Sequence, residues 1–193
     1  MTNNILIFLR HAETKVEKGV KNSEWSLTTK GKLDALKIVE SKPFDNINII
    51  IASAEEKALN TAYPLAGELK IKILIEADLN EIKRDHGKFL DTQRYIITMK
   101  QCMTNRDKSF NNWETANNAL ERFSKKIEEI DFKHGRKKIL IVSHGVVINL
   151  YFAKVLGKLE DVFDRAQTNT FCDYGIIQNN NVIRDIATKI RNH

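Results

Sequence analysis

The sequence lacks the features of disulfide-crosslinked, repeat and multidomain proteins. Its 193 residues include two cysteines and two prolines, with no internal repeat and no tract rich in proline or glycine. Cys102 and Cys172 lie far apart in the chain and lack the spacing of a metal-binding pair. We therefore expect one domain over residues 1–193 and a reducing, cytoplasmic environment.

Long apolar runs are missing as well. No apolar stretch approaches the roughly 20 residues that a helix needs to span a bilayer, and the N-terminus lacks the cationic start of a signal peptide. The formal net charge is +6, which suits an anionic partner. Because the lysines are scattered and no recognised nucleic-acid-binding motif accompanies them, we expect neither nucleic acid nor a membrane as a partner.

Short apolar runs bounded by turn-forming residues predict β-strands. They cover residues 5–9, 47–52, 71–75, 139–142, 171–177 and 182–187. Apolar residues three and four positions apart predict helices over 58–69, over 113–130 and from Gly145 onward. Thr28 is predicted to cap a further helix that buries Leu33, Leu36 and Val39. Strands that alternate with helices predict an α/β fold with a mostly parallel central sheet and helices on both faces.

Two of the predicted strands end in histidine. One is followed by Arg10 and His11, and the other by His144 and Gly145. Ligands of open α/β sheets bind beyond the carboxyl ends of the strands, so we expect these side chains to meet there. A metal is disfavoured because the strand-end arginine would repel it. A phosphate is favoured, since arginine offers planar donors that match phosphate oxygens and a helix start adds backbone N–H groups.

Several short motifs occur in the order that is typical of one family. They are RHAET (10–14), WSLTTKG (25–31), SAEEKALNTA (53–62), LNE (79–81), SHG (143–145) and TNT (168–170). In this order the chain resembles the histidine phosphatase superfamily, also called the phosphoglycerate mutase-like family. The resemblance implies a phosphoglycerate mutase-like fold and a metal-independent phosphatase that acts on a small phosphomonoester and needs no cofactor.

The resemblance also implies roles for individual residues. His11 would be the nucleophile that forms a phosphohistidine, and the cationic Arg10 beside it would disfavour an imidazolium. Glu81 would protonate the leaving oxygen and later deprotonate water, with Asp78 and Asp85 as alternatives for this acid. His144 would take part in catalysis and bind phosphate. The further phosphate ligands would be Arg10, Lys57 and Thr14.

The chain departs from the family pattern at three places, one of which is a looser spacing from Glu81 to the next glycine, Gly87. Lys57 stands where the family has an arginine, and lysine is a point charge without the planar fork. Glu17 stands near the place of a family asparagine, and we expect its carboxylate to point away from the phosphate. Two other functions therefore stay open, a phosphoglycerate-type mutase and a catalytically weak relative that binds a phosphorylated ligand or a protein.

The segment 83–112 does not fit the alternation of strands and helices. It is predicted to form a helical insertion over the active site, because insertions above strand ends often form a pocket wall. The apolar face of this insertion is predicted to comprise Tyr95, Ile96, Met99 and Met103. Its basic residues are Lys83, Arg84, Lys88 and Arg94. These cations either meet a second anionic group of the substrate or form a solvated face.

Overall fold

A computed structural model describes residues 2–187, and a single mixed sheet runs through it. The strand order is β3-β2-β4-β1-β5-β6. The strands are β1 (Ile5–Arg10), β2 (Ile49–Ser53), β3 (Ile73–Glu76), β4 (Lys138–Ser143), β5 (Tyr174–Gln178) and β6 (Asn181–Arg184). Strands β1 to β4 pair in parallel, whereas β5 and β6 are antiparallel to their neighbours. The prediction of a mostly parallel sheet is confirmed.

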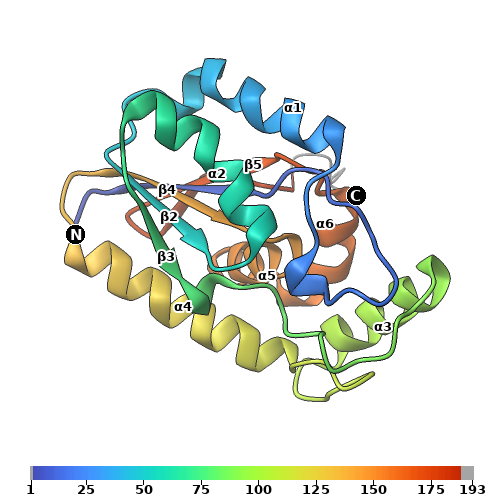
Figure 1. Cartoon of the computed structure of the whole chain (residues 1–193). Helices are drawn as coiled ribbons and strands as arrows, with labels where there is room; N and C mark the ends of the chain where they lie inside the picture. The colour runs from blue at the N-terminus through green and yellow to red at the C-terminus, as the bar shows by residue number, and fades with distance from the viewer. Residues whose placement is uncertain (1, 188–193) are drawn as a thin grey trace.

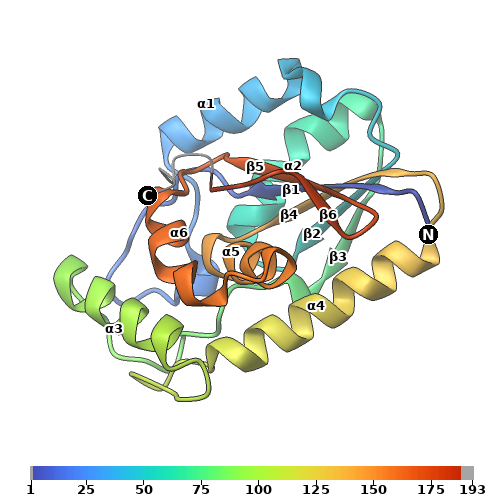
Figure 2. The same cartoon turned by 180° about the vertical axis from the view of Figure 1, so that it is seen from behind.

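Helices cover both faces of this sheet, as predicted. The α-helices are α1 (Thr29–Lys37), α2 (Glu56–Leu69), α3 (Thr92–Thr104), α4 (Ala116–Lys133), α5 (Gly145–Leu156) and α6 (Val162–Thr168). Helices α1 and α2 lie on one side of the sheet, and α4 and α5 lie on the other (Figures 1 and 2). Helix α3 lies at one end of the molecule, where it contacts α6.

Strand β1 is apolar throughout because it is covered on both faces. Leu6 and Phe8 belong to the cluster formed with α4 and α5, whereas Ile7 and Leu9 belong to the cluster formed with α2. Side chains alternate between the two faces of a strand, which explains this division. Both layers of the core therefore hold the strand that leads into His11.

Some strand boundaries differ from the predicted ones. Strand β5 begins at Tyr174 rather than at Phe171. The backbone of Cys172 has φ +59°, a left-handed conformation that no strand contains. Strand β6 ends at Arg184 and so stops short of the predicted 187. Strands β2 and β3 begin two residues later than predicted, at Ile49 and Ile73.

The predicted buried face of α1 is wrong at Leu33 and Leu36, whereas Val39, in the turn after the helix, is half-buried and packs against the core. Thr28 caps the helix as expected, with its Oγ1 accepting from Gly31 N at 2.9 Å. However, Leu33 and Leu36 are 54% and 55% exposed, and the buried residues of the helix are Gly31 and Ala35. A Cβ at Gly31 would lie 2.2 Å from the carbonyl oxygen of Glu13. The helix therefore packs through its small residues against the loop that follows β1.

Candidate active site

The two strand-end histidines lie side by side. Strands β1 and β4 are adjacent, and their register pairs Arg10 with Ser143. The backbone N–H of His11 donates to the carbonyl oxygen of Ser143 at 2.9 Å, which extends the pairing beyond the strands. The imidazole rings of His11 and His144 are 5.1 Å apart between centroids. The structure thus brings together the histidines that the strand pattern predicted to meet.

The imidazole of His11 is held in one tautomer. Its Nδ1 lies 2.8 Å from the carbonyl oxygen of Ala12, which can only accept a hydrogen bond. Nδ1 therefore carries the proton, and the lone pair of Nε2 is free. Burial, and next the charge of Arg10, lowers the pKa of His11 well below its usual range. Thr61 fixes the same loop, because its Oγ1 accepts from Ala12 N at 2.9 Å.

His144 is fully buried and is held in the opposite tautomer. The hydroxyl of Ser53 donates to Asn80 Oδ1 at 2.9 Å, so it accepts from His144 Nε2 at 2.7 Å. The proton is then on Nε2. Within residues 2–187, Nδ1 of His144 is buried without a hydrogen-bond partner. Burial, followed by the charge of His11, lowers the pKa of His144 well below its usual range.

Arg10 is positioned by residues to which the sequence analysis gave no role beside it. Its Nη1 donates to the carbonyl oxygen of Asn169 at 2.5 Å, and its guanidinium lies 4.6 Å from the ring centre of Phe171. A Cβ at Gly145 would come within 3.1 Å of this guanidinium, so the glycine leaves room for it. Phe171 was predicted to begin a strand over 171–177, but β5 begins at Tyr174, so Phe171 lies outside the sheet and can contact Arg10.

Glu81 sits at the N-terminus of α5. Its two carboxylate oxygens accept from the backbone N–H groups of Ile82 at 2.9 Å, Val146 at 3.1 Å and Val147 at 3.3 Å. A carboxylate has about four lone-pair sites, so three bonds leave room for one proton or one further donor. The side chain is 6% exposed and lines the active-site cavity described below.

The two alternative acids lie elsewhere. The Asp78 side chain is 54% exposed and lies 4.0 Å from the ammonium of Lys126. Asp85 accepts from the backbone N–H and the hydroxyl of Ser23. Neither aspartate lines the cavity that contains Glu81. Glu81 is thus the acidic side chain of the three that is placed to reach a bound ligand.

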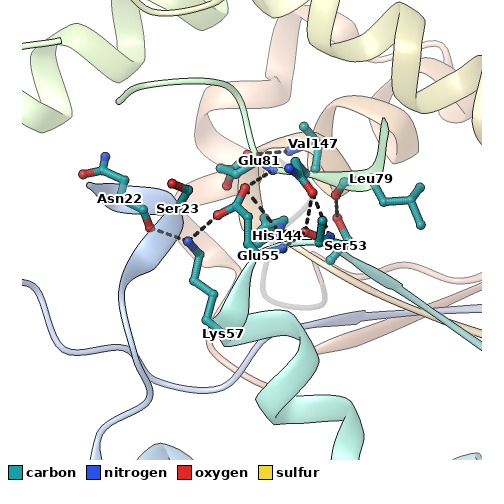
Figure 3. A network of polar contacts seen from close by, with 12 residues as sticks. Asn22, Ser23, Ser53, Glu55, Lys57, Leu79, Glu81, His144 and Val147 are labelled. Atoms are coloured by element: carbon teal, nitrogen blue, oxygen red, sulfur yellow. Dashed lines mark hydrogen bonds and ion pairs between the residues drawn. The ribbon is translucent and has the colours of Figure 1, made fainter. Parts of the chain in front are cut away.

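Lys57 is buried at the same end of the sheet, but it is paired with a carboxylate. Its ammonium donates to the carbonyl oxygen of Asn22 at 2.6 Å and forms an ion pair with Glu55 Oε2 (Figure 3). The other oxygen of Glu55 accepts from Glu81 N at 2.7 Å and lies 3.6 Å from His144 Nε2. Sequence reasoning missed Glu55, although its place two residues before Lys57 at a strand end was an available signal.

A cavity of about 640 Å³ opens over these groups. Of the predicted site residues, it is lined by Arg10, His11, Thr14, Lys57 and Glu81. Its apolar wall includes Trp25, Phe89, Tyr95, Ile96, Met99, Trp113, Phe163 and Phe171. His144 lies behind this surface, and Glu17 pairs with Lys15 outside it, in keeping with the expected orientation of Glu17.

The basic residues of the segment 83–112 divide into two groups. Arg84 and Lys88 line the cavity, whereas Lys83 is exposed and Arg94 pairs with Asp91. Arg84 is held by aromatic side chains. Its Nη1 donates to the hydroxyl of Tyr95 at 2.8 Å, and its guanidinium lies 5.4 Å from the ring centres of Tyr95 and Trp113. The Arg84 guanidinium is therefore held in place at the wall of the active-site cavity.

The arrangement of motifs agrees with a comparison of the whole sequence with protein families. Residues 6–180 match the family described as the histidine phosphatase superfamily (branch 1). The chain belongs to this superfamily. No functionally curated protein matches this histidine phosphatase significantly.

Solved structures of similar fold include several phosphatases. Bacillus stearothermophilus YhfR matches this histidine phosphatase with a TM-score of 0.76 at 23% identity, covering 94% of this chain and 95% of that chain. Alpha-ribazole phosphatase from Shigella flexneri matches with a TM-score of 0.74 at 18% identity, over 97% and 100%. A mycobacterial glucosyl-3-phosphoglycerate phosphatase matches with a TM-score of 0.75 at 14% identity, over 89% and 88%. At these identities the likeness shows the shared fold.

Two features are absent from residues 2–187 of this histidine phosphatase. None of the helices found there is long and apolar enough to cross a membrane. In the same residues, no three or more His, Cys, Asp or Glu side chains are grouped so that they could hold a metal ion.

Proposed function

We propose that this histidine phosphatase hydrolyses a small phosphomonoester without a metal, through a phosphohistidine on His11. The observation that carries the proposal is the state of the His11 imidazole. Its Nδ1 is bonded to the carbonyl oxygen of Ala12 at 2.8 Å, which leaves Nε2 as the nucleophilic atom. The lowered pKa keeps this ring unprotonated at neutral pH, so it can attack phosphorus.

The phosphoryl group would be held by the cations at the strand ends. Arg10 and Lys57 supply positive charge to its oxygens, and Thr14 lines the same part of the cavity. The Nδ1 atom of His144 has no hydrogen-bond partner within residues 2–187 and carries no proton in the neutral ring. In the neutral ring, Nδ1 can accept a hydrogen bond from a phosphoryl oxygen that carries a proton.

The reaction would proceed in two displacements. In the first, His11 Nε2 forms a bond to phosphorus while the ester P–O bond breaks and protonated Glu81 gives its proton to the leaving oxygen. In the second, the Glu81 carboxylate takes a proton from water as the water oxygen attacks phosphorus and the N–P bond breaks. Inorganic phosphate leaves, and Glu81 is protonated again for the next cycle.

Selectivity would reside in the segment 83–112. The structural neighbours include phosphatases named for glucosyl-3-phosphoglycerate, alpha-ribazole and phosphoserine, which differ widely in the organic group. We expect Arg84 to contact a second anionic group of the substrate beside Tyr95. Arg84→Ala should then raise KM for a phosphomonoester that carries a carboxylate, with little effect on nitrophenyl phosphate. Equal effects on both substrates would contradict this role.

A trapping experiment tests the proposed function. Labelled substrate mixed with the protein and quenched in base should leave label on His11, and acid should release it, because the adduct is a phosphoramidate. His11→Ala should abolish both the label and turnover of nitrophenyl phosphate. Full turnover by this variant would refute the proposal. A requirement for a bisphosphorylated primer would favour the mutase, and sulfate binding without turnover by the unaltered protein would favour the binding-only relative.

A further inference from the structure

The Glu55 carboxylate takes up a hydrogen-bonding position on Lys57 that a phosphate would otherwise use. An ammonium group has three N–H donors. In Lys57, one donates to the carbonyl oxygen of Asn22 at 2.6 Å and another is directed at Glu55 Oε2. A single donor remains for a ligand. The Lys57 and Glu55 side chains are 3% and 6% exposed, so water and salt screen the ion pair little.

Charged groups on several elements face Glu55. Lys57 on α2 and Arg84 on the segment before α3 favour the ionised carboxylate, whereas Glu81 repels it. His144, at the end of β4, lies 3.6 Å from its Oε1. Burial outweighs the attraction of Lys57, and the net result is a raised pKa for Glu55. The Glu55 carboxylate is therefore an anion in contact with Lys57 and close to His144, and burial makes it easier to protonate than an ordinary glutamate.

We propose that Glu55 is an internal competitor of the substrate phosphate for Lys57, and that it thereby sets the pH range in which the site binds phosphate. The inference rests on the proposed function in taking phosphate as the ligand. When Glu55 Oε2 takes a proton from solvent, the negative charge opposite Lys57 disappears, while Oε1 continues to accept from Glu81 N. The Lys57 N–H that was directed at Glu55 Oε2 then becomes available to the phosphate. By linkage, bound phosphate must favour the protonation of Glu55 to the same extent.

Sulfate is a suitable probe, because it is a tetrahedral dianion whose own charge does not change between about pH 5 and pH 8. Glu55→Gln keeps the shape of the side chain and an acceptor for Glu81 N, but removes the charge. Its binding of sulfate at pH 7.5, measured by calorimetry, should be roughly 10- to 100-fold tighter than that of the unaltered protein, as expected for one charged hydrogen bond. The gain should shrink as the pH is lowered, because Glu55 of the unaltered protein then loses its charge as well. Glu56→Gln, on the exposed neighbouring residue, should bind like the unaltered protein.

A second pair of variants separates competition from simple repulsion. In a Lys57→Ala background, Glu55→Gln should give little gain, because the residue for which Glu55 competes is gone. Sulfate binding by Glu55→Gln that is no tighter than in the unaltered protein, or a gain as large without Lys57 as with it, would overturn the proposal. Glu55→Asp, which draws the carboxylate back by one methylene, should show a smaller gain and serves if the glutamine variant does not fold.

The result is independent of catalysis. Calorimetry reads sulfate binding without turnover, so the expected pattern in a protein that forms no adduct on His11 would refute the proposed reaction and leave the role of Glu55 intact. Conversely, an adduct on His11 together with unchanged sulfate binding in Glu55→Gln would support the reaction and refute the competition.

Discussion

Replacing Glu81 by glutamine separates its proposed chemistry from its position at the start of α5. The carboxylate accepts three backbone N–H groups, those of Ile82, Val146 and Val147. Glutamine has one acceptor oxygen, which can keep the bonds from Ile82 and Val147, but its NH₂ group faces the N–H of Val146. One buried donor then lacks a partner, which costs about 1–3 kcal/mol of the free energy of unfolding.

The effect on activity should depend on the leaving group. A poor leaving group such as an alkoxide needs a proton, and general acid catalysis contributes roughly 10²–10⁴ in rate. An alkyl phosphate should therefore lose about this factor in kcat/KM in Glu81→Gln, while nitrophenyl phosphate, whose leaving group is stable as an anion, should lose far less. Both rates are measured together with urea unfolding of the same preparation. Asp78→Asn is the control and should leave both rates unchanged.

A capping role alone makes a different prediction. If Glu81 only fixes the N-terminus of α5, both substrates should slow by the same factor in Glu81→Gln, with the same loss of stability. That outcome would refute the assignment of Glu81 as the acid. Unequal slowing in Asp78→Asn would move the assignment to that aspartate.

Three further predictions concern metals, packing and pH. Chelator treatment should leave turnover unchanged, and a loss restored by Mg²⁺ or Zn²⁺ would contradict the metal-free mechanism. Phe8→Ala should lower the free energy of unfolding in urea by about 3–5 kcal/mol, because the fully buried ring lies among Phe123, Tyr151 and Phe152. Folding lowers the pKa values of His11 and His144. The free energy of unfolding should therefore be highest, as far as these two groups decide it, above about pH 6.5, the ordinary imidazole pKa. Below that pH it should fall by about 1.4 kcal/mol per pH unit and per histidine. A pH dependence unchanged in His144→Gln would contradict the last expectation.

The central part of the site could be predicted because it depends on the ends of strands. A buried parallel strand has a strongly apolar sequence, so its last residue is easily recognised, and polar side chains directly after it must lie at the edge of the sheet. Arg10, His11 and His144 are positions of this kind. Their placement needs only that β1 and β4 are neighbours in the sheet, with Arg10 paired to Ser143.

The face of a short helix is harder to predict. In α1, a pattern of large apolar residues favoured a buried face that the structure leaves exposed. The helix instead approaches the loop after β1 so closely that only Gly31 and Ala35 fit at the contact. Apolar periodicity measures which residues can be buried, but it does not record how near the neighbouring backbone comes.

Glu55 shows why the counter-charge of the site was missed. It is the residue before the first turn of α2, and its backbone is extended, with φ −76° and ψ 136°. An extended residue at this position directs its side chain back over the strand end. A glutamate one turn further along the helix would point away from the site. The sequence places Glu55 and Lys57 two positions apart, a spacing that puts side chains on different faces of a regular helix. Their ion pair forms because α2 begins between them, at Glu56. The Glu55 side chain extends from the residue before the helix, and the Lys57 side chain extends from the first turn of the helix. The charge available to a phosphate in this protein thus depends on where one helix begins.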